Sequence, residues 1–118
     1  MTNYISYITR KVGGKMLKPI IGTKSKEQVF IFLIASETGY ATEIARFFDA
    51  ELYAIQTQLE RLENAEVLVS SKVGRTRIFQ FNPQYPFINE LKDLLKKALS
   101  YYPNEIKERL VMNRRRPS

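Results

Sequence analysis

The sequence contains no cysteine and no histidine among its 118 residues. Without cysteine there is no disulfide bond, no thiolate nucleophile and no cysteine-ligated zinc. Without histidine the commonest general base and the commonest metal ligand are missing. Metal sensing is therefore not expected, because only carboxylate sites for hard cations remain open. We expect no cofactor and no bound metal.

Long hydrophobic segments are also missing. The longest apolar run covers residues 29–35, whereas a membrane-spanning helix needs about 20 apolar residues. The N-terminal sequence MTNYISYITRKVGGK has no charged segment followed by a long apolar one, so no secretory signal is predicted. The length favours one domain with one modest core. We expect a cytoplasmic protein that does not associate with a membrane.

The formal charge of +7 is unevenly distributed along the chain. Residues 1–26 carry six Lys or Arg residues and no acid, whereas residues 27–66 carry eight acids and two arginines. Residues 67–82 carry three basic residues and no acid, and residues 83–118 have a net charge of +4. A polyanion is a plausible partner for the basic segments. The alternative is that the excess of Lys and Arg only keeps the protein soluble.

The segments before residue 25 give weak structural signals. Residues 3–8 place apolar side chains at a spacing that suits one helix face, which predicts a helical arm or a flexible lead. Residues 15–22 predict a short apolar turn, because Pro19 prevents a long helix.

A buried helix is predicted for residues 25–37. Ser25 and Gln28 have the spacing of a capping box, in which each side chain satisfies a backbone N–H of the first turn. The run VFIFLIA that follows could equally be a buried strand, but the cap and the length favour a helix. Gly39 is predicted to stop this helix as its C-terminal glycine.

Residues 42–65 predict two further helices, separated by a turn at Asp49 and Ala50. The first helix covers residues 42–48 and the second covers residues 51–65. The second has one apolar face that we expect to pack on the core, formed by Leu52, Ile55, Leu59 and Leu62. The opposite face is polar and consists of Tyr53, Thr57 and Glu60, flanked by Gln56 and Arg61.

Residues 67–73 and 76–82 are predicted to form a β-hairpin, since they are rich in β-branched and aromatic residues. Gly74 and Arg75 fit a two-residue turn with glycine first. Phe79 and Phe81 share one face of the second strand, which we expect to point to the core. The hairpin is basic throughout, with Lys72, Arg75 and Arg77 and no acid.

Two helices are predicted at the C-terminal end. Residues 87–100 have an amphipathic pattern with one apolar face, and Asn104 caps a helix that runs from residue 105 to about residue 112. Residues 113–118 contain three consecutive arginines and are predicted to be a disordered basic tail.

Three helices followed by a basic hairpin form a layout that can read DNA. A recognition helix in the major groove needs an apolar inner face and a hydrogen-bonding outer face. The Gln56 side chain can form paired hydrogen bonds to adenine. Tyr53 and Thr57 can reach base edges or phosphates, and Arg61 can contact the DNA backbone. The hairpin would contact phosphates or the minor groove through Lys72, Arg75, Thr76 and Arg77. The alternative for each residue is an ordinary solvated surface.

The chain also resembles a known family over residues 24–85. The segment that carries the resemblance is ATEIARFFDAELYAIQTQLERLENAEVLVSSKVGRTRIFQFNP, which is similar to winged helix-turn-helix transcriptional regulators of the ArsR-like kind. The resemblance implies that residues 50–63 form the recognition helix and residues 72–77 the wing. The metal-binding Cys and His of metal-sensing members are absent here, and Asp49 replaces the glycine that many relatives have in the turn.

Members of that family are usually homodimers joined by terminal helices. The resemblance therefore implies that residues 87–100, and as a second candidate residues 3–8, join two copies of the chain. The apolar face of residues 87–100 would supply the dimer contacts, through Ile88, Leu91, Leu95 and Leu99.

We therefore predict an α+β, mainly helical winged helix with terminal helical extensions. Its parts are a basic arm at residues 1–22, a DNA-binding domain at 23–85, dimerisation helices at 86–112 and a tail at 113–118. The expected function is a homodimeric repressor that binds double-stranded DNA and is not an enzyme.

The acidity of the predicted recognition helix favours an alternative function. This segment contains one arginine and four glutamates, Glu51, Glu60, Glu63 and Glu66. Their carboxylates would be repelled by the phosphates of DNA. The alternative is therefore a winged helix that binds another protein.

Overall fold

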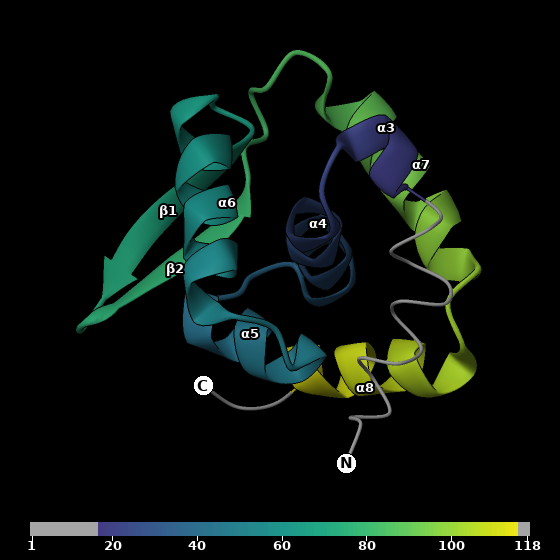
Figure 1. Cartoon of the computed structure of the whole chain (residues 1–118). Helices are drawn as coiled ribbons and strands as arrows, with labels where there is room; N and C mark the ends of the chain where they lie inside the picture. The colour runs from purple at the N-terminus through teal and green to yellow at the C-terminus, as the bar shows by residue number, and fades with distance from the viewer. Residues whose placement is uncertain (1–16, 116–118) are drawn as a thin grey trace.

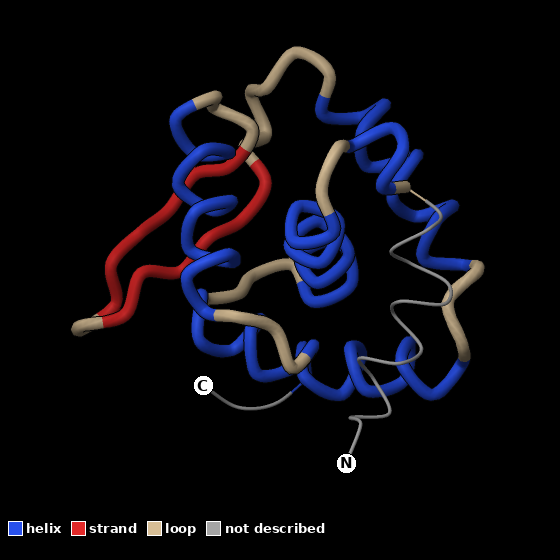
Figure 2. Tube along the Cα trace, viewed as in Figure 1, coloured by secondary structure: helices blue, strands red, loops and turns tan. Residues whose placement is uncertain are grey.

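The structure is a computed structural model that describes residues 17–115. Residues 1–16 and 116–118, with the helix predicted at residues 3–8, lie outside the described residues. In chain order the elements are α3 (Lys18–Ile21), α4 (Lys24–Ser36), α5 (Ala41–Phe48), α6 (Leu52–Asn64), β1 (Leu68–Val73), β2 (Thr76–Phe81), α7 (Ile88–Ser100) and α8 (Asn104–Arg115). The hairpin projects to one side of a helical body (Figure 2). The predicted mainly helical winged-helix fold is confirmed.

Helix α4 occupies the centre of the molecule. Figure 1 views it along its axis, with α5, α6, α7 and α8 arranged around it. Residues 29–33 are all buried, so this helix is apolar on every side instead of along one stripe. The alternative of a buried strand for this run is wrong, because the run lies inside a 13-residue helix.

The ends of α4 differ from their prediction. Thr23 is the N-cap, and its hydroxyl oxygen accepts a hydrogen bond from the Lys26 N–H at 3.1 Å, while Ser25 lies inside the helix. Threonine and serine are similar cap residues, so the sequence pattern did not separate the two positions. At the C-terminal end Glu37, and not Gly39, adopts a positive φ of 74°.

Gly39 has a different role, which is to let the hairpin approach α4. Its N–H and C=O both bond to Phe79 of β2, at 3.1 and 2.8 Å, and form an isolated antiparallel bridge to the hairpin. A Cβ atom at Gly39 would lie 2.8 Å from the ring of Phe32. Glycine is therefore required here by close packing and not by backbone conformation.

Helices α7 and α8 complete the core of this single chain. Leu95, Ile106 and Leu110 are fully buried, and the Ser36 hydroxyl donates to the Leu110 carbonyl. Helix α8 continues to Arg115, beyond the end predicted near residue 112, so residues 113–115 are helical and not a disordered tail. None of the helices in the described range 17–115 is long and apolar enough to cross a membrane.

The predicted dimer face needs a correction. Ile88 and Leu95 are buried within their own chain, where α7 packs on α4, so these two side chains cannot form the surface of a dimer. Leu91 and Leu99 are half-buried at the edge of the same core. The amphipathic pattern correctly identified a buried face of α7, but this face packs on α4 of the same chain and not on a second copy.

A buried carboxylate joins three parts of the chain. Glu27 of α4 is fully buried, and it accepts hydrogen bonds from the Leu17 N–H at 3.2 Å and the Tyr102 hydroxyl at 2.8 Å. Burial raises the pKa of Tyr102 far above its ordinary value, and the charge of Glu27 and the hydrogen bond add to the shift. Tyr102 lies between α7 and α8, so this pair fixes the C-terminal helices to α4.

Replacing Tyr102 tests this link. We expect Tyr102→Phe to lower the free energy of unfolding at pH 7 by about 1–3 kcal/mol, since Glu27 loses a buried hydrogen-bond donor. Above about pH 10 the unfolded wild-type chain releases the Tyr102 proton, whereas the folded state retains it. The free energy of unfolding therefore decreases as the pH rises above about 10. The variant should lack this group's share of the slope, up to about 1.4 kcal/mol per pH unit.

Urea unfolding at neutral and alkaline pH measures both effects. The control is Tyr101→Phe, because the neighbouring Tyr101 side chain is 63% exposed. Its stability should stay within about 0.5 kcal/mol of wild type. Equal losses in the two variants would contradict the role given to Tyr102.

Candidate nucleic-acid interface

The turn between α5 and α6 sets the angle of the two helices. Asp49 adopts the left-handed conformation with φ 54°, as expected for an aspartate in place of glycine. The Ala50 N–H then bonds to the Ala45 carbonyl at 2.8 Å and closes the turn. At the other end of α5, the Tyr40 N–H donates to the Glu43 carboxylate. Both ends of α5 are therefore fixed locally.

The inner face of α6 packs largely as predicted. Ile55, Leu59 and Leu62 are buried, but Leu52 is 40% exposed in the first turn and does not belong to the core. Gln58 is buried instead, and its side-chain oxygen has no hydrogen-bond partner within the described part of the chain. A periodicity that counts only apolar residues could not identify this position.

The outer face of α6 presents the four predicted recognition residues in two directions. Tyr53 is 77% exposed, Gln56 and Arg61 are exposed, and Thr57 is half-buried. At about 100° per residue, Arg61 lies roughly 140° around the helix from Gln56. Gln56 lies on the flank that faces the hairpin, whereas Arg61 lies on the other flank.

The hairpin is buried at its base and exposed at its tip. Leu68 pairs with Phe81 at the base, where both side chains are buried. Gly74, with φ 65°, starts the two-residue turn as predicted. Near the tip Lys72 lies directly opposite Arg77, and both are exposed. Like charges placed directly opposite each other destabilise a sheet. A bound anion would reduce the repulsion between these two side chains.

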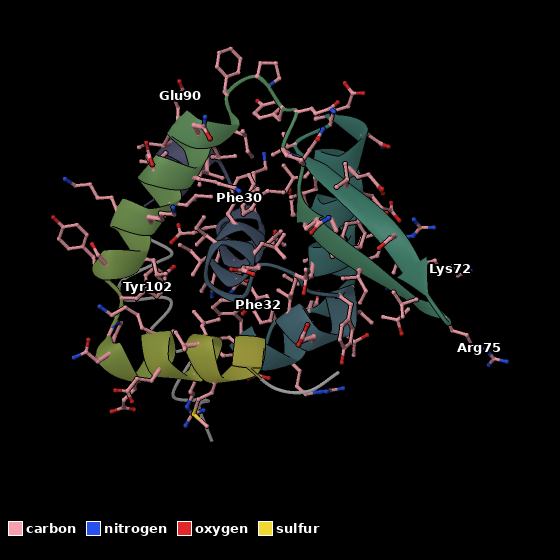
Figure 3. All side chains as sticks on the ribbon, turned by 180° about the vertical axis from the view of Figure 1, so that it is seen from behind. Phe30, Phe32, Lys72, Arg75, Glu90 and Tyr102 are labelled. Carbon is pink, nitrogen blue, oxygen red and sulfur yellow. The ribbon has the colours of Figure 1, made fainter. Side chains whose placement is uncertain are left out.

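Figure 3 shows Lys72 and Arg75 at the end of the hairpin that lies farthest from the helical body. No acidic side chain occurs in residues 67–82, so the tip is a surface of one charge sign. Such a surface attracts polyanions over a range set by the Debye length, about 8–10 Å at physiological salt.

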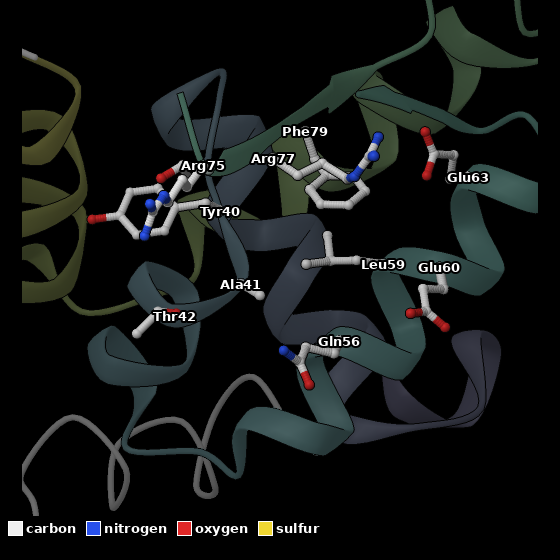
Figure 4. A pocket seen from close by; sticks show the side chains of 11 residues that line it. Tyr40, Ala41, Thr42, Gln56, Leu59, Glu60, Glu63, Arg75, Arg77 and Phe79 are labelled. Atoms are coloured by element: carbon white, nitrogen blue, oxygen red, sulfur yellow. The ribbon is translucent and has the colours of Figure 1, made fainter. Parts of the chain in front are cut away.

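A groove of about 600 Å³ separates α6 from the hairpin (Figure 4). It brings Gln56 of α6 together with Arg75, Thr76 and Arg77 of the hairpin. Tyr53, Thr57, Arg61 and Lys72 are not among its lining residues. The remaining lining residues come from the start of α5, from α6 and from β2, and are Tyr40, Ala41, Thr42, Leu59, Glu60, Glu63 and Phe79.

Glu63 of this groove was considered in the sequence only as one of the acids of this helix, with no structural role. Its carboxylate accepts a hydrogen bond from the Ser70 hydroxyl of β1, at 2.5 Å. Ser70 in turn accepts a bond at 2.8 Å from the Arg77 guanidinium of β2. The three side chains link α6 to both strands of the hairpin. No sequence pattern indicates this link, since it joins a helix to two strands.

Comparisons with known proteins support the fold. No family model matches the sequence, and no curated protein shows significant similarity to it. A solved structure of Lactococcus lactis ZitR, a double mutant in its apo form, superposes with a TM-score of 0.52 at 19% sequence identity. The alignment covers 92% of this chain and 84% of that chain. At this identity the likeness concerns the winged-helix architecture alone.

Proposed function

We propose that this protein is a transcriptional regulator that binds double-stranded DNA, as a homodimeric repressor without enzymatic activity. The observation that carries the proposal is the groove whose lining includes Gln56 of α6 together with Arg75 and Arg77 of the hairpin. An amide of the kind that can read a base and two guanidinium groups of the kind that can bind phosphates thus line one groove. The ArsR-like resemblance of residues 24–85 supports the same function.

In this proposal α6 enters the major groove and the hairpin acts as the wing. The carboxamide of Gln56 makes paired hydrogen bonds to adenine. The exposed Tyr53 and the half-buried Thr57 reach base edges or phosphates, while Arg61 contacts the DNA backbone from the opposite flank of α6. Lys72, Arg75, Thr76 and Arg77 hold the phosphates or enter the minor groove.

Because α6 is acidic, the helix and the wing contribute differently to DNA binding in this proposal. Glu51, Glu60 and Glu66 are exposed on or next to the helix, whereas Arg61 is its one cation. Such a helix adds base contacts but little attraction to DNA. Affinity in this proposal therefore comes from the wing and from the basic segments outside residues 27–66.

We assign the contact with a second copy of the chain to an apolar groove of about 430 Å³, which is lined by residues of α3, α4, the end of α6 and the start of α7. Phe87 is 64% exposed and Leu94 is 38% exposed along this groove. Lys26 and Glu90 also line it. A two-fold related copy would place these opposite charges across the interface. The dimer would then present two recognition helices about 34 Å apart, one turn of DNA.

The second candidate function is a protein-binding winged helix. Leu52 and Tyr53 are exposed at the start of α6, and Val73 is exposed near the tip of the wing. Exposed apolar side chains on these elements suit a protein surface. This function predicts no salt-dependent binding to duplex DNA.

The wing arginines are tested together by Arg75→Ala with Arg77→Ala. We expect weaker binding to duplex DNA from the protein's own promoter region and a flatter salt dependence. The slope of log K against log salt should fall by about one unit per lost phosphate contact. Anisotropy titrations at several salt concentrations measure it. A slope equal to that of wild type would contradict the assignment of the wing.

Gln56→Ala tests base reading. We expect a loss on the order of 1–3 kcal/mol for the operator that has the preferred base pair at one position, and little loss for operators altered there. A set of duplexes with single base-pair changes measures this pattern. An equal loss for every duplex would instead give Gln56 a backbone role.

The proposed dimer is tested by Phe87→Ser with Leu94→Ser, measured by light scattering across a concentration series. Removing two large apolar contacts should raise the dimer dissociation constant by at least about tenfold. The control is Met112→Ser, because Met112 is exposed on α8 away from the groove. A dimer that survives the double substitution unchanged would place the interface elsewhere.

A further inference from the structure

We propose that Glu63 and Ser70 are positioning residues that hold the Arg77 guanidinium in the groove between α6 and the wing, ready to bind a phosphate. This inference rests on the proposed function, since it assigns the preorganisation of one DNA-binding cation. It gives an acidic residue of the recognition helix a favourable role in binding an anion.

The direction of the Arg77 side chain follows from the register of the hairpin. Ser70 pairs with Phe79, and Lys72 pairs with Arg77. These four residues share one face, because alternate residues of a strand point to the same side. Phe79 is buried at the base of this face, so the face turns toward the helical body and α6. Arg77 is on the same face and lines the groove.

The hydrogen bonds then restrict where the guanidinium can lie. Arg77 Nη1 donates to Ser70 Oγ at 2.8 Å, so the side chain lies back along the hairpin instead of extending beyond its tip. Ser70 uses its own proton on Glu63 of α6, which leaves its oxygen free to accept from Arg77. A guanidinium has five N–H donors, and no other hydrogen bond of Arg77 occurs among residues 17–115.

Holding Arg77 in this way reduces the cost of binding. A free arginine side chain loses considerable rotamer freedom when it binds a phosphate, and a preorganised one has already lost it. Without the link, Arg77 would also be repelled by Lys72 directly opposite and would move away from the groove. The tether therefore keeps the Arg77 cation in the groove between α6 and the hairpin, which Gln56 also lines.

Glu60 provides the contrast that makes the role of Glu63 testable. It lies one turn earlier on α6, lines the same groove and is exposed, and it makes no hydrogen bond within residues 17–115. Glu60 can only repel a bound phosphate. Removing its charge should strengthen DNA binding, whereas removing the charge of Glu63 also weakens the tether.

The decisive variant is Ser70→Ala, which breaks the link without changing any charge. We expect its affinity for the promoter duplex to fall by about three- to tenfold, the cost of ordering one long side chain on binding. Ser71→Ala is the matched control, since Ser71 is the exposed next residue on the opposite face. It should bind within about twofold of wild type, and Ser70→Thr, which keeps the hydroxyl, should restore affinity.

Two further comparisons separate positioning from simple repulsion. In an Arg77→Ala background, Ser70→Ala should have no additional effect on DNA affinity. Glu60→Gln should tighten binding, while Glu63→Gln should not. Equal binding by the Ser70→Ala and Ser71→Ala proteins, or equal tightening by both glutamine variants, would overturn the positioning role.

The tether is also tested in the protein without DNA. A double-mutant cycle of Ser70→Ala and Arg77→Ala, followed by urea unfolding, should show non-additive changes in the unfolding midpoint. Additive changes would overturn the tether itself. A wild-type protein that binds no duplex at any salt concentration would instead overturn the proposed function, so the two failures are distinguishable.

Discussion

The apolar circumference of α4 is the constraint on which the rest of the structure depends. Because residues 29–33 are buried on every side, this helix cannot lie at a surface, and each of its sides must be covered by another element. Helices α5 and α6 cover part of it, α7 and α8 cover another part, and the base of the hairpin covers a third. The terminal helices are therefore part of the fold and not only extensions of it.

The same helix places the two halves of the candidate site. Phe30 of α4 stacks on Phe81 at the base of β2, with ring centroids 6.0 Å apart. The buried face of α6 packs on the same helix. Helix α6 and the hairpin thus pack on the same central helix, and Glu63, Ser70 and Arg77 add a direct link between them. Helix α6 is acidic and the hairpin is basic, and one of the helix carboxylates, that of Glu63, hydrogen-bonds to the hairpin.

Sequence reasoning predicted the features that depend on local rules. The burial of Ile55, Leu59 and Leu62, the left-handed Asp49 and the glycine-first hairpin turn all follow from spacing or backbone preference, and the structure has each of them. Three features depend on which surfaces meet in space. Gly39 is needed because Phe32 lies against it, Ile88 and Leu95 are covered by α4 of the same chain, and Glu63 reaches Ser70 across two elements. A sequence pattern indicates that a side chain is buried, but it does not indicate which element buries it.

The exposed face of α6 contributes little to the packing of the chain. Tyr53, Gln56 and Glu60 have no share in the buried core, so exchanging them leaves the support provided by α4 intact. Surface substitutions of this kind usually change stability by no more than about 0.5 kcal/mol. These positions can therefore diverge during evolution, or be varied in a library, without loss of folding. Gln58 marks the limit of that freedom, since it lies on the same helix but inside the core.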